Sequence, residues 1–119
     1  MFAYEKLDVW QMAKSLIIKV YKLTRYFPDS EKFGLVSQVS RAAISVASNL
    51  AEGSGRMSYK EQAYFTQLAY SSLMEVACQL DIAKELGFIE EHHWKSVKPE
   101  IEDLSYKLSA LRNSQLRRK

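Results

Sequence analysis

The sequence predicts an all-α protein, folded as an antiparallel up-down-up-down four-helix bundle. The chain has 119 residues, of which 47% are hydrophobic and 26% are charged, a composition typical of one globular domain. Pro28, the pair Gly53 and Gly55, and Gly87 divide it into four segments with apolar residues at helical spacing. Because the connections are short, neighbouring helices should run antiparallel. We expect one domain over residues 1–119, with helices at about 6–27, 31–53, 58–86 and 90–116.

The first segment has the pattern of an amphipathic helix. Within residues 8–27 the apolar side chains fall on one half of a helical wheel, with Ile18 as an exception on the polar half. That polar half carries no acidic residue and is basic through Lys14, Lys22 and Arg25. The first helix should therefore bury one side and present a cationic side to solvent.

The second segment should begin at Asp29 or Ser30, since both residue types favour the N-cap position of a helix. Ala and Ser are frequent along this segment, and such small side chains allow another helix to approach closely. Gly53 and Gly55 then supply the permissive backbone on which the chain leaves the helix.

Ser58 and Glu61 mark the start of the third helix, because Ser-x-x-Glu is the pattern of a capping box. Gly87 is the expected C-terminal cap. Within residues 62–80 the only charged side chain is Glu75, so the outer face of this helix is unusually apolar. The outer helix of a lone bundle should carry more charge, and we expect this helix to contact another subunit.

The fourth segment has the most regular pattern. From Trp94 to Leu111 its apolar residues are separated alternately by three and four positions, a heptad spacing suited to antiparallel packing. Pro99 lies within this pattern and has no backbone N–H group, so we expect a kink at that residue.

The apolar stripes of the four segments together predict one hydrophobic core. The predicted core residues are Trp10, Ile17, Val20, Val39, Val46, Leu50, Phe65, Leu73, Val76, Leu80, Ile101, Leu104 and Leu108.

The net charge of +3 is unevenly distributed. Five basic residues and no acidic residue follow position 103, so the first 103 residues carry a net charge of −2. A nearly neutral body with a basic C-terminal end can bind polyanions, and it is equally typical of a solvated helix end.

The single cysteine and the N-terminal sequence indicate in which cellular compartment the protein is expected. Cys78 is the only cysteine, which excludes an intramolecular disulfide, and its apolar neighbours favour a small buried side chain over a reactive thiol. Residues 1–8 lack the apolar stretch of a signal peptide, and the longest uncharged run, residues 62–74, is too short to span a bilayer. We expect a cytoplasmic protein without membrane contact.

No pattern in the sequence indicates an enzyme, a cofactor or a metal site. Gly53 and Gly55 are flanked by helices, whereas a phosphate-binding loop follows a strand. The serines lie within helices, without a histidine at a spacing suited to nucleophilic catalysis. His92 and His93 are adjacent, so on a helix they should diverge by about 100° and fail to bind one ion together. We therefore expect a protein that is not an enzyme and that needs no cofactor or metal.

Polar residues on one side of the second helix form a further candidate cluster. Arg41, Asn49 and Glu52 share that side, and Arg56 can pair with Glu52 or cap the end of the helix. We expect a structural cluster at a helix or subunit interface rather than a ligand site.

One long motif and four short ones stand out in the first three segments. They are Gln38-x-x-Arg41-Ala42-Ala43-x-Ser45-x-x-x-Asn49-x-Ala51-Glu52-Gly53-x-Gly55-Arg56, with Val9-Trp10-Gln11, Phe33-Gly34-Leu35, Glu75-x-x-x-Gln79-Leu80 and Leu86-Gly87. Together they resemble the bacterial four-helix-bundle proteins encoded in 23S rRNA intervening sequences, over about residues 7–88. Ser40 stands where the commoner form of the signature has a second arginine.

The resemblance implies an assembly and a class of partner. This family is similar to the accessory variability proteins of diversity-generating retroelements, which form homopentameric barrels and bind nucleic acid and a reverse transcriptase. The resemblance thus implies a ring of bundles, most simply a homopentamer. The residues expected at its subunit interface are Ile18, Tyr64, Tyr70, Met74 and Ile82.

Two functions remain open from the sequence. The first is a non-enzymatic oligomer that binds RNA or DNA through basic residues of the first and fourth helices. The second is a scaffold that holds a partner protein without touching nucleic acid. The residues expected to contact nucleic acid are Lys14, Lys22, Arg25, Arg112, Arg117 and Arg118.

Overall fold

The computed structural model describes residues 1–118 as four α-helices that follow one another along the chain. They are α1 (Asp8–Thr24), α2 (Leu35–Ser54), α3 (Tyr59–Glu85) and α4 (Glu91–Arg117). Two short 3-10 helices, η1 (Ala3–Lys6) and η2 (Asp29–Glu31), precede α1 and α2. The described residues contain no β-strand, so the predicted all-α class is confirmed.

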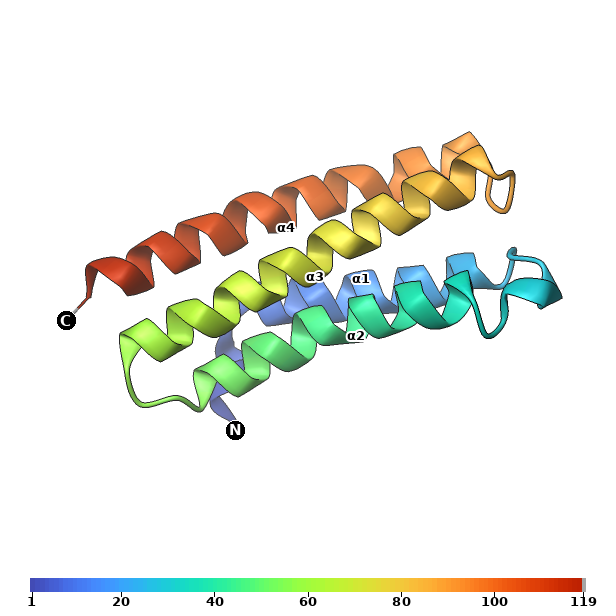
Figure 1. Ribbon diagram of the computed structural model, residues 1–119. Coiled ribbons are helices and arrows are strands. Elements are labelled where there is room, and N and C mark those ends of the chain that lie inside the picture. Colours follow the sequence, from blue (N-terminus) through green and yellow to red (C-terminus); the bar gives the residue numbers. More distant parts are fainter. Residues whose placement is uncertain (119) are drawn as a thin grey trace.

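Successive helices run in opposite directions, up, down, up and down (Figure 1). Contacts join α1 to α2, α2 to α3, α3 to α4 and α4 back to α1, and within the described residues none joins the diagonal pairs. An α-helix of 27 residues, the length of α3 and α4, is about 40 Å long, which accounts for the 48 × 23 × 22 Å extents of the molecule. The predicted antiparallel bundle is therefore the observed arrangement.

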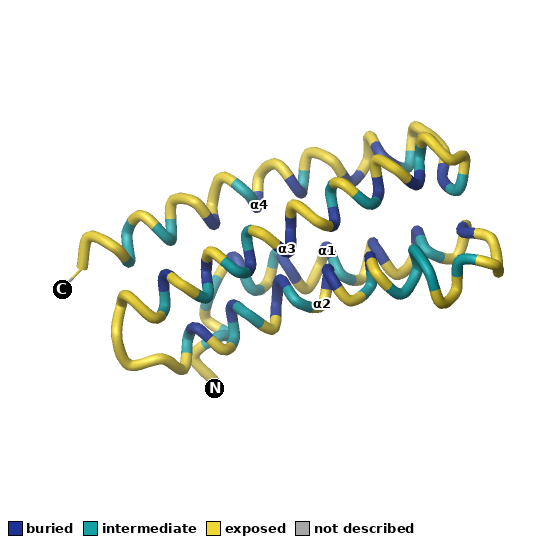
Figure 2. Tube along the Cα trace, in the orientation of Figure 1, coloured by how far each residue is buried: buried dark blue, intermediate teal, exposed yellow. Residues whose placement is uncertain are grey.

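The buried residues lie along the inner sides of the helices, where the helical patterns place them (Figure 2). In α1 the buried residues are Val9, Ala13, Leu16, Val20 and Leu23, a spacing of three and four. In α4 they are Trp94, Val97, Ile101, Leu104 and Leu108, which confirms the predicted heptad pattern. Ten of the thirteen predicted core residues are buried.

The other three predicted core residues, Trp10, Ile17 and Phe65, are only partly buried. Trp10 and Ile17 pack against the edge of the core from the α1 side that turns toward α2. The Arg56 guanidinium lies 4.7 Å from the centre of the Phe65 ring and covers one part of it. These three residues lie at the margin of the core rather than inside it, because a helical wheel gives the direction of a side chain but not how completely the neighbouring elements cover it.

The start of α2 differs from the expectation. Asp29 and Ser30 are not its N-cap, because they lie in η2, and the α-helix begins only at Leu35. The Glu31 carboxylate accepts a hydrogen bond from the Leu35 N–H group at 3.1 Å, so a side chain four residues upstream satisfies the first turn. The first helix is also shorter than expected, since α1 ends at Thr24.

Both ends of α3 agree with the sequence motifs. The Glu61 N–H group donates to the Ser58 hydroxyl at 3.1 Å, which makes Ser58 the N-cap. Gly87 has a φ of +79°, and the Phe88 N–H group donates to the Ala83 carbonyl at 2.9 Å. This left-handed glycine with its six-residue hydrogen bond is a Schellman motif, and it turns the chain toward α4.

The helix α4 runs through Pro99 as one element. Proline donates no backbone hydrogen bond, so the carbonyl group one turn earlier lacks its usual helical partner. None of the helices in the described part of the chain is both long and apolar enough to cross a membrane.

Candidate functional site

The six basic residues expected to bind nucleic acid have no acidic partner within the described chain. Four other cations are paired, among them Lys19 with Glu100 and Arg56 with Glu52. Five of the six candidates are exposed and Arg112 is partly buried. Unpaired surface cations are free to bind an anion without first breaking an ion pair.

These basic residues do not form one patch on a single bundle. Lys14 lies in a hollow between α1 and α2, where its ammonium group is 5.6 Å from the centre of the Trp10 ring. Arg112 lies in a shallow hollow between α3 and α4, beside Gln67 and Tyr70. Because α1–α2 and α3–α4 are opposite sides of the bundle, Lys14 and Arg112 lie on different faces of one chain.

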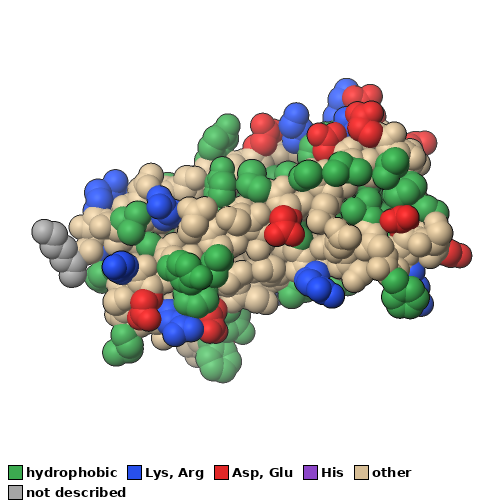
Figure 3. Space-filling view, viewed as in Figure 1, with side chains coloured by type: hydrophobic (Ala, Val, Ile, Leu, Met, Phe, Trp, Pro, Cys, Tyr) green, Lys and Arg blue, Asp and Glu red, His purple; other side chains and the backbone are tan. Residues whose placement is uncertain are grey.

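The C-terminal cluster instead packs beside the first turns of α3. The Arg118 guanidinium lies 5.3 Å from the centre of the Tyr59 ring, and Thr66 donates a 2.8 Å hydrogen bond to the Gln115 side chain. Figure 3 shows basic side chains gathered at this end of the bundle. Lys119, the last residue of the basic segment, lies outside the described residues.

Four of the five residues expected at a subunit interface are exposed in the single chain. Their exposed fractions are 50% for Ile18, 60% for Tyr64, 37% for Met74 and 46% for Ile82. Tyr70, the fifth, is partly buried because it packs against the core next to α4. The exposed residues do not share one face, since Ile18 lies on the α1–α2 side and the others lie on α3.

Sequence reasoning missed most of an apolar hollow around Ile18. This hollow of about 580 Å³ lies between α1 and α2 and includes Trp10, Ile17 and Ile44. Ile44 is 42% exposed although it occupies a helix face rich in Ser. The spacing of Ile44, Ala47 and Ala51 was the available signal, because residues three and four apart share a helix face.

The polar residues of α2 form separate small contacts rather than one cluster. Arg56 donates to the Glu52 carboxylate at 2.9 Å. Asn49 donates to the backbone and hydroxyl oxygens of Ser45, both at 2.9 Å. No hydrogen bond within residues 1–118 joins Arg41, Asn49 and Glu52 to one another, so they form no connected cluster within one chain.

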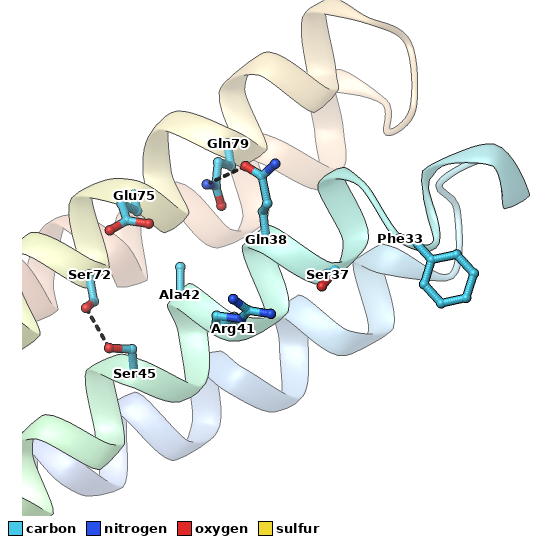
Figure 4. A pocket seen from close by; sticks show the side chains of 9 residues that line it. All are labelled: Phe33, Ser37, Gln38, Arg41, Ala42, Ser45, Ser72, Glu75 and Gln79. Atoms are coloured by element: carbon cyan, nitrogen blue, oxygen red, sulfur yellow. Dashed lines mark hydrogen bonds between the residues drawn. The ribbon is translucent and has the colours of Figure 1, made fainter.

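Arg41 lines a different feature, a hollow of about 410 Å³ between α2 and α3. Two hydrogen bonds between the helices cross it, from Gln79 to Gln38 at 3.5 Å and between the Ser45 and Ser72 hydroxyls at 2.9 Å (Figure 4). We call this feature the α2–α3 hollow. It is lined by Phe33, Ser37, Gln38, Arg41, Ala42, Ser45, Ser72, Glu75 and Gln79.

Cys78 is exposed, which corrects the expectation of a buried side chain. The apolar neighbours Val76 and Leu80 are buried on the opposite side of α3, while Cys78 shares its side with Met74 and Ile82. The apolar neighbours of Cys78 in the sequence suggested that it is buried. That prediction was wrong because the outer face of α3 is apolar as well as the inner face.

His92 and His93 lie closer together than the helical wheel predicted. Their ring centres are 4.1 Å apart. Three possible ligand atoms, one each from Glu90, His92 and His93, lie within 4.8 Å of one another. The spacing Glu90-x-x-His93 was a signal that the sequence reasoning overlooked. His93 Nδ1 already accepts the Glu90 N–H group at 3.0 Å, and the positive end of the α4 dipole opposes a cation, so these residues serve as the cap of α4.

Comparison with known proteins identifies the family. The model of the 23S rRNA-intervening sequence protein matches residues 5–110. A crystal structure of a protein of unknown function from the S23 ribosomal protein family of Bacteroides thetaiotaomicron is similar, with a TM-score of 0.77 and 15% identity over 87% of this chain and 96% of that chain. No curated protein matches the chain. The structural likeness extends to the fold alone, but the family model spans most of the sequence, and the chain therefore belongs to the 23S rRNA-intervening sequence protein family.

Proposed function

We propose that this protein is a non-enzymatic, cytoplasmic homo-oligomer that binds RNA or DNA as an accessory protein. It contacts the phosphate backbone and reads no base sequence. The six residues proposed to make these contacts are Lys14, Lys22, Arg25, Arg112, Arg117 and Arg118.

The observation that carries the proposal is the distribution of ion pairs. Within the described chain these six cations have no acidic partner, whereas Lys19, Arg56, Lys84 and Lys95 each have one. A cation that is already paired must first release its carboxylate before it contacts a phosphate, a step that costs about 0–1 kcal/mol at an exposed site. Unpaired cations, these six among them, can neutralise phosphates and release counterions without first breaking an ion pair.

Oligomerisation is part of the proposal, because one chain has a net charge of only +3 and its candidate cations lie on separate faces. A ring places the same few cations of every subunit along one nucleic-acid strand, and several weak contacts then act together. The exposed apolar side chains of α3 and the hollow around Ile18 are the surfaces proposed to join the subunits. A homopentamer is the assembly that the family resemblance implies.

Sequence-independent binding fits the positions of the tryptophans. Trp94 is buried in the core, and Trp10 packs against the core edge beneath Lys14. The buried Trp94 ring is not available to stack on an unpaired base, and the Trp10 ring is only partly exposed. Phosphate contacts then dominate the affinity.

The experiment is a fluorescence anisotropy titration with mixed-sequence RNA and DNA of equal length at several salt concentrations. We expect binding at about 50 mM salt and a steep loss as salt rises, with a log–log slope of about −0.7 to −0.9 for each phosphate contacted. Absence of binding to both polymers at low salt contradicts the proposal.

A scaffold for a partner protein is the second candidate, and the apolar hollow around Ile18 and Ile44 favours it. A partner held by apolar contacts would be retained at high salt. Affinity capture from the native cell extract, with and without nuclease treatment, separates the two functions. Partners lost after nuclease treatment support nucleic-acid binding, and partners retained support the scaffold.

A further inference from the structure

The α2–α3 hollow contains two charged side chains of opposite sign that have no partner. Arg41 is the only charged residue in residues 35–51, and Glu75 is the only one in residues 62–80. Both are exposed and both line this hollow. No ion pair joins them to each other or to another described residue. Each of these two otherwise uncharged helix segments thus places its one charged side chain at the α2–α3 hollow.

The space between these charges is kept open by its surroundings. Figure 4 shows Arg41 on α2 and Glu75 on α3, with the small side chain of Ala42 between them. The Ser45–Ser72 and Gln38–Gln79 hydrogen bonds hold the two helices together on either side of Ala42. A volume of about 410 Å³ lies within the range of small-molecule sites.

A third polar group in the hollow also lacks a partner. The Gln79 Oε1 atom is buried and accepts no hydrogen bond within the described residues. An unsatisfied buried acceptor costs free energy that a donor restores. Gln79 lies on the same helix as Glu75 and one turn away, so a cationic donor group in the hollow can lie close to both side chains.

We propose that the α2–α3 hollow binds a small zwitterion of the α-amino acid class. The guanidinium of Arg41 receives the ligand carboxylate, and the carboxylate of Glu75, with Gln79 beside it, receives the ligand ammonium group. The hollow has no net charge from Arg41 and Glu75, so a polyanion gains from one side chain and is repelled by the other. A zwitterion gains from both, which separates this site from the basic residues proposed to bind nucleic acid.

The test uses the full-length protein, labelled with ¹⁵N, and the twenty free amino acids added singly at millimolar concentration. We expect at least one of them to shift amide resonances of Gln38, Arg41, Ser72 and Glu75. Its N-acetyl derivative lacks the ammonium group and its amide lacks the carboxylate, so each should bind at least about tenfold more weakly. These analogues test the proposal on the unaltered protein, where folding is not in question.

Two variants, each of which replaces one charged side chain with an uncharged one, identify the contacts. Glu75→Gln should weaken binding at least about tenfold and abolish the preference for the free amino acid over its N-acetyl derivative. Arg41→Gln should also weaken binding at least about tenfold, and it should abolish the preference for the free amino acid over its amide. Glu102→Gln and Lys107→Gln, at exposed positions of α4, are the matched controls and should leave binding unchanged.

Three results would overturn the proposal. The first is the absence of resonance shifts with every amino acid, and the second is equal binding of the single-charge analogues. The third is a change in particle mass in Arg41→Gln or Glu75→Gln, which would mean that another protein copy covers the hollow. The first two results leave the nucleic-acid proposal untouched, and the third concerns the assembly, so the anisotropy titration with RNA and DNA tests that proposal separately.

Discussion

Gly53, near the end of α2, lies directly against Phe65 of α3. A Cβ atom at position 53 would come within 2.9 Å of the Phe65 Cβ atom, closer than two carbon atoms can pack without displacement. The absence of a side chain at Gly53 therefore sets how closely the ends of α2 and α3 approach. The contact also explains why a glycine is buried within the last turn of a helix.

The variant Gly53→Ala is expected to lower the free energy of unfolding by about 1–3 kcal/mol, because the added methyl group must push α3 away. Gly55→Ala is the matched control, since its Cβ atom would meet only the Glu52 carbonyl oxygen at 3.6 Å. That change should be neutral or stabilising by up to about 1 kcal/mol. Urea unfolding followed by circular dichroism measures both, and equal stabilities would contradict the close contact.

Leu80 is fully buried in the core, and Ile82 two residues later is exposed. Leu80→Ala should cost about 2–5 kcal/mol of stability, because it removes buried contacts and leaves a cavity. Ile82→Ala should change the stability of the single chain by less than about 1 kcal/mol. The same unfolding measurement tests this pair, and a small effect at Leu80 would place it outside the core.

The proposed assembly predicts that a charge on an exposed apolar residue disrupts it. Met74→Arg and Ile18→Arg should each reduce the particle mass toward the 13.7 kDa of one chain, since a buried unpaired charge is strongly unfavourable. Tyr106 is an exposed aromatic residue of α4 outside the proposed interface, so Tyr106→Arg should leave the particle mass unchanged. Light scattering during gel filtration gives the masses. A 13.7 kDa particle for the unaltered protein would exclude the oligomer.

Cys78 provides an independent measure of the same interface. It is exposed in the single chain and shares a helix side with Met74 and Ile82. We expect a thiol reagent to react slowly with the assembled protein and faster with the Met74→Arg variant, in which that surface is uncovered. Equal rates would remove this side of α3 from the interface.

The nucleic-acid proposal predicts different effects for unpaired and paired cations. Arg117→Gln with Arg118→Gln should weaken binding to all sequences alike and flatten the salt dependence, because phosphate contacts are lost. Lys84→Gln with Lys95→Gln removes the same charge from ion-paired positions and should change little. These substitutions are cleaner than deletion of residues 112–119, which would also remove the Gln115 partner of Thr66. Equal losses in both double variants would mean that net charge alone drives binding.

The pattern of residues determined the helices and most of the core. The spacing of Trp94, Val97 and Ile101 fixed the buried side of α4, and Ser58 and Gly87 fixed the limits of α3. These features are local, because helical periodicity and capping depend on residues within a few positions of one another. They were predictable from the sequence for that reason.

Only the tertiary structure decided which side chains meet across helices. Arg112 and Arg118 of α4 lie beside residues of α3, whereas Lys14 of α1 lies beside residues of α2. Arg41 and Glu75 are far apart in the sequence, and they line one hollow because α2 and α3 pack at a particular register. Register and close approach depend on contacts such as that of Gly53 with Phe65, which periodicity along one helix does not contain.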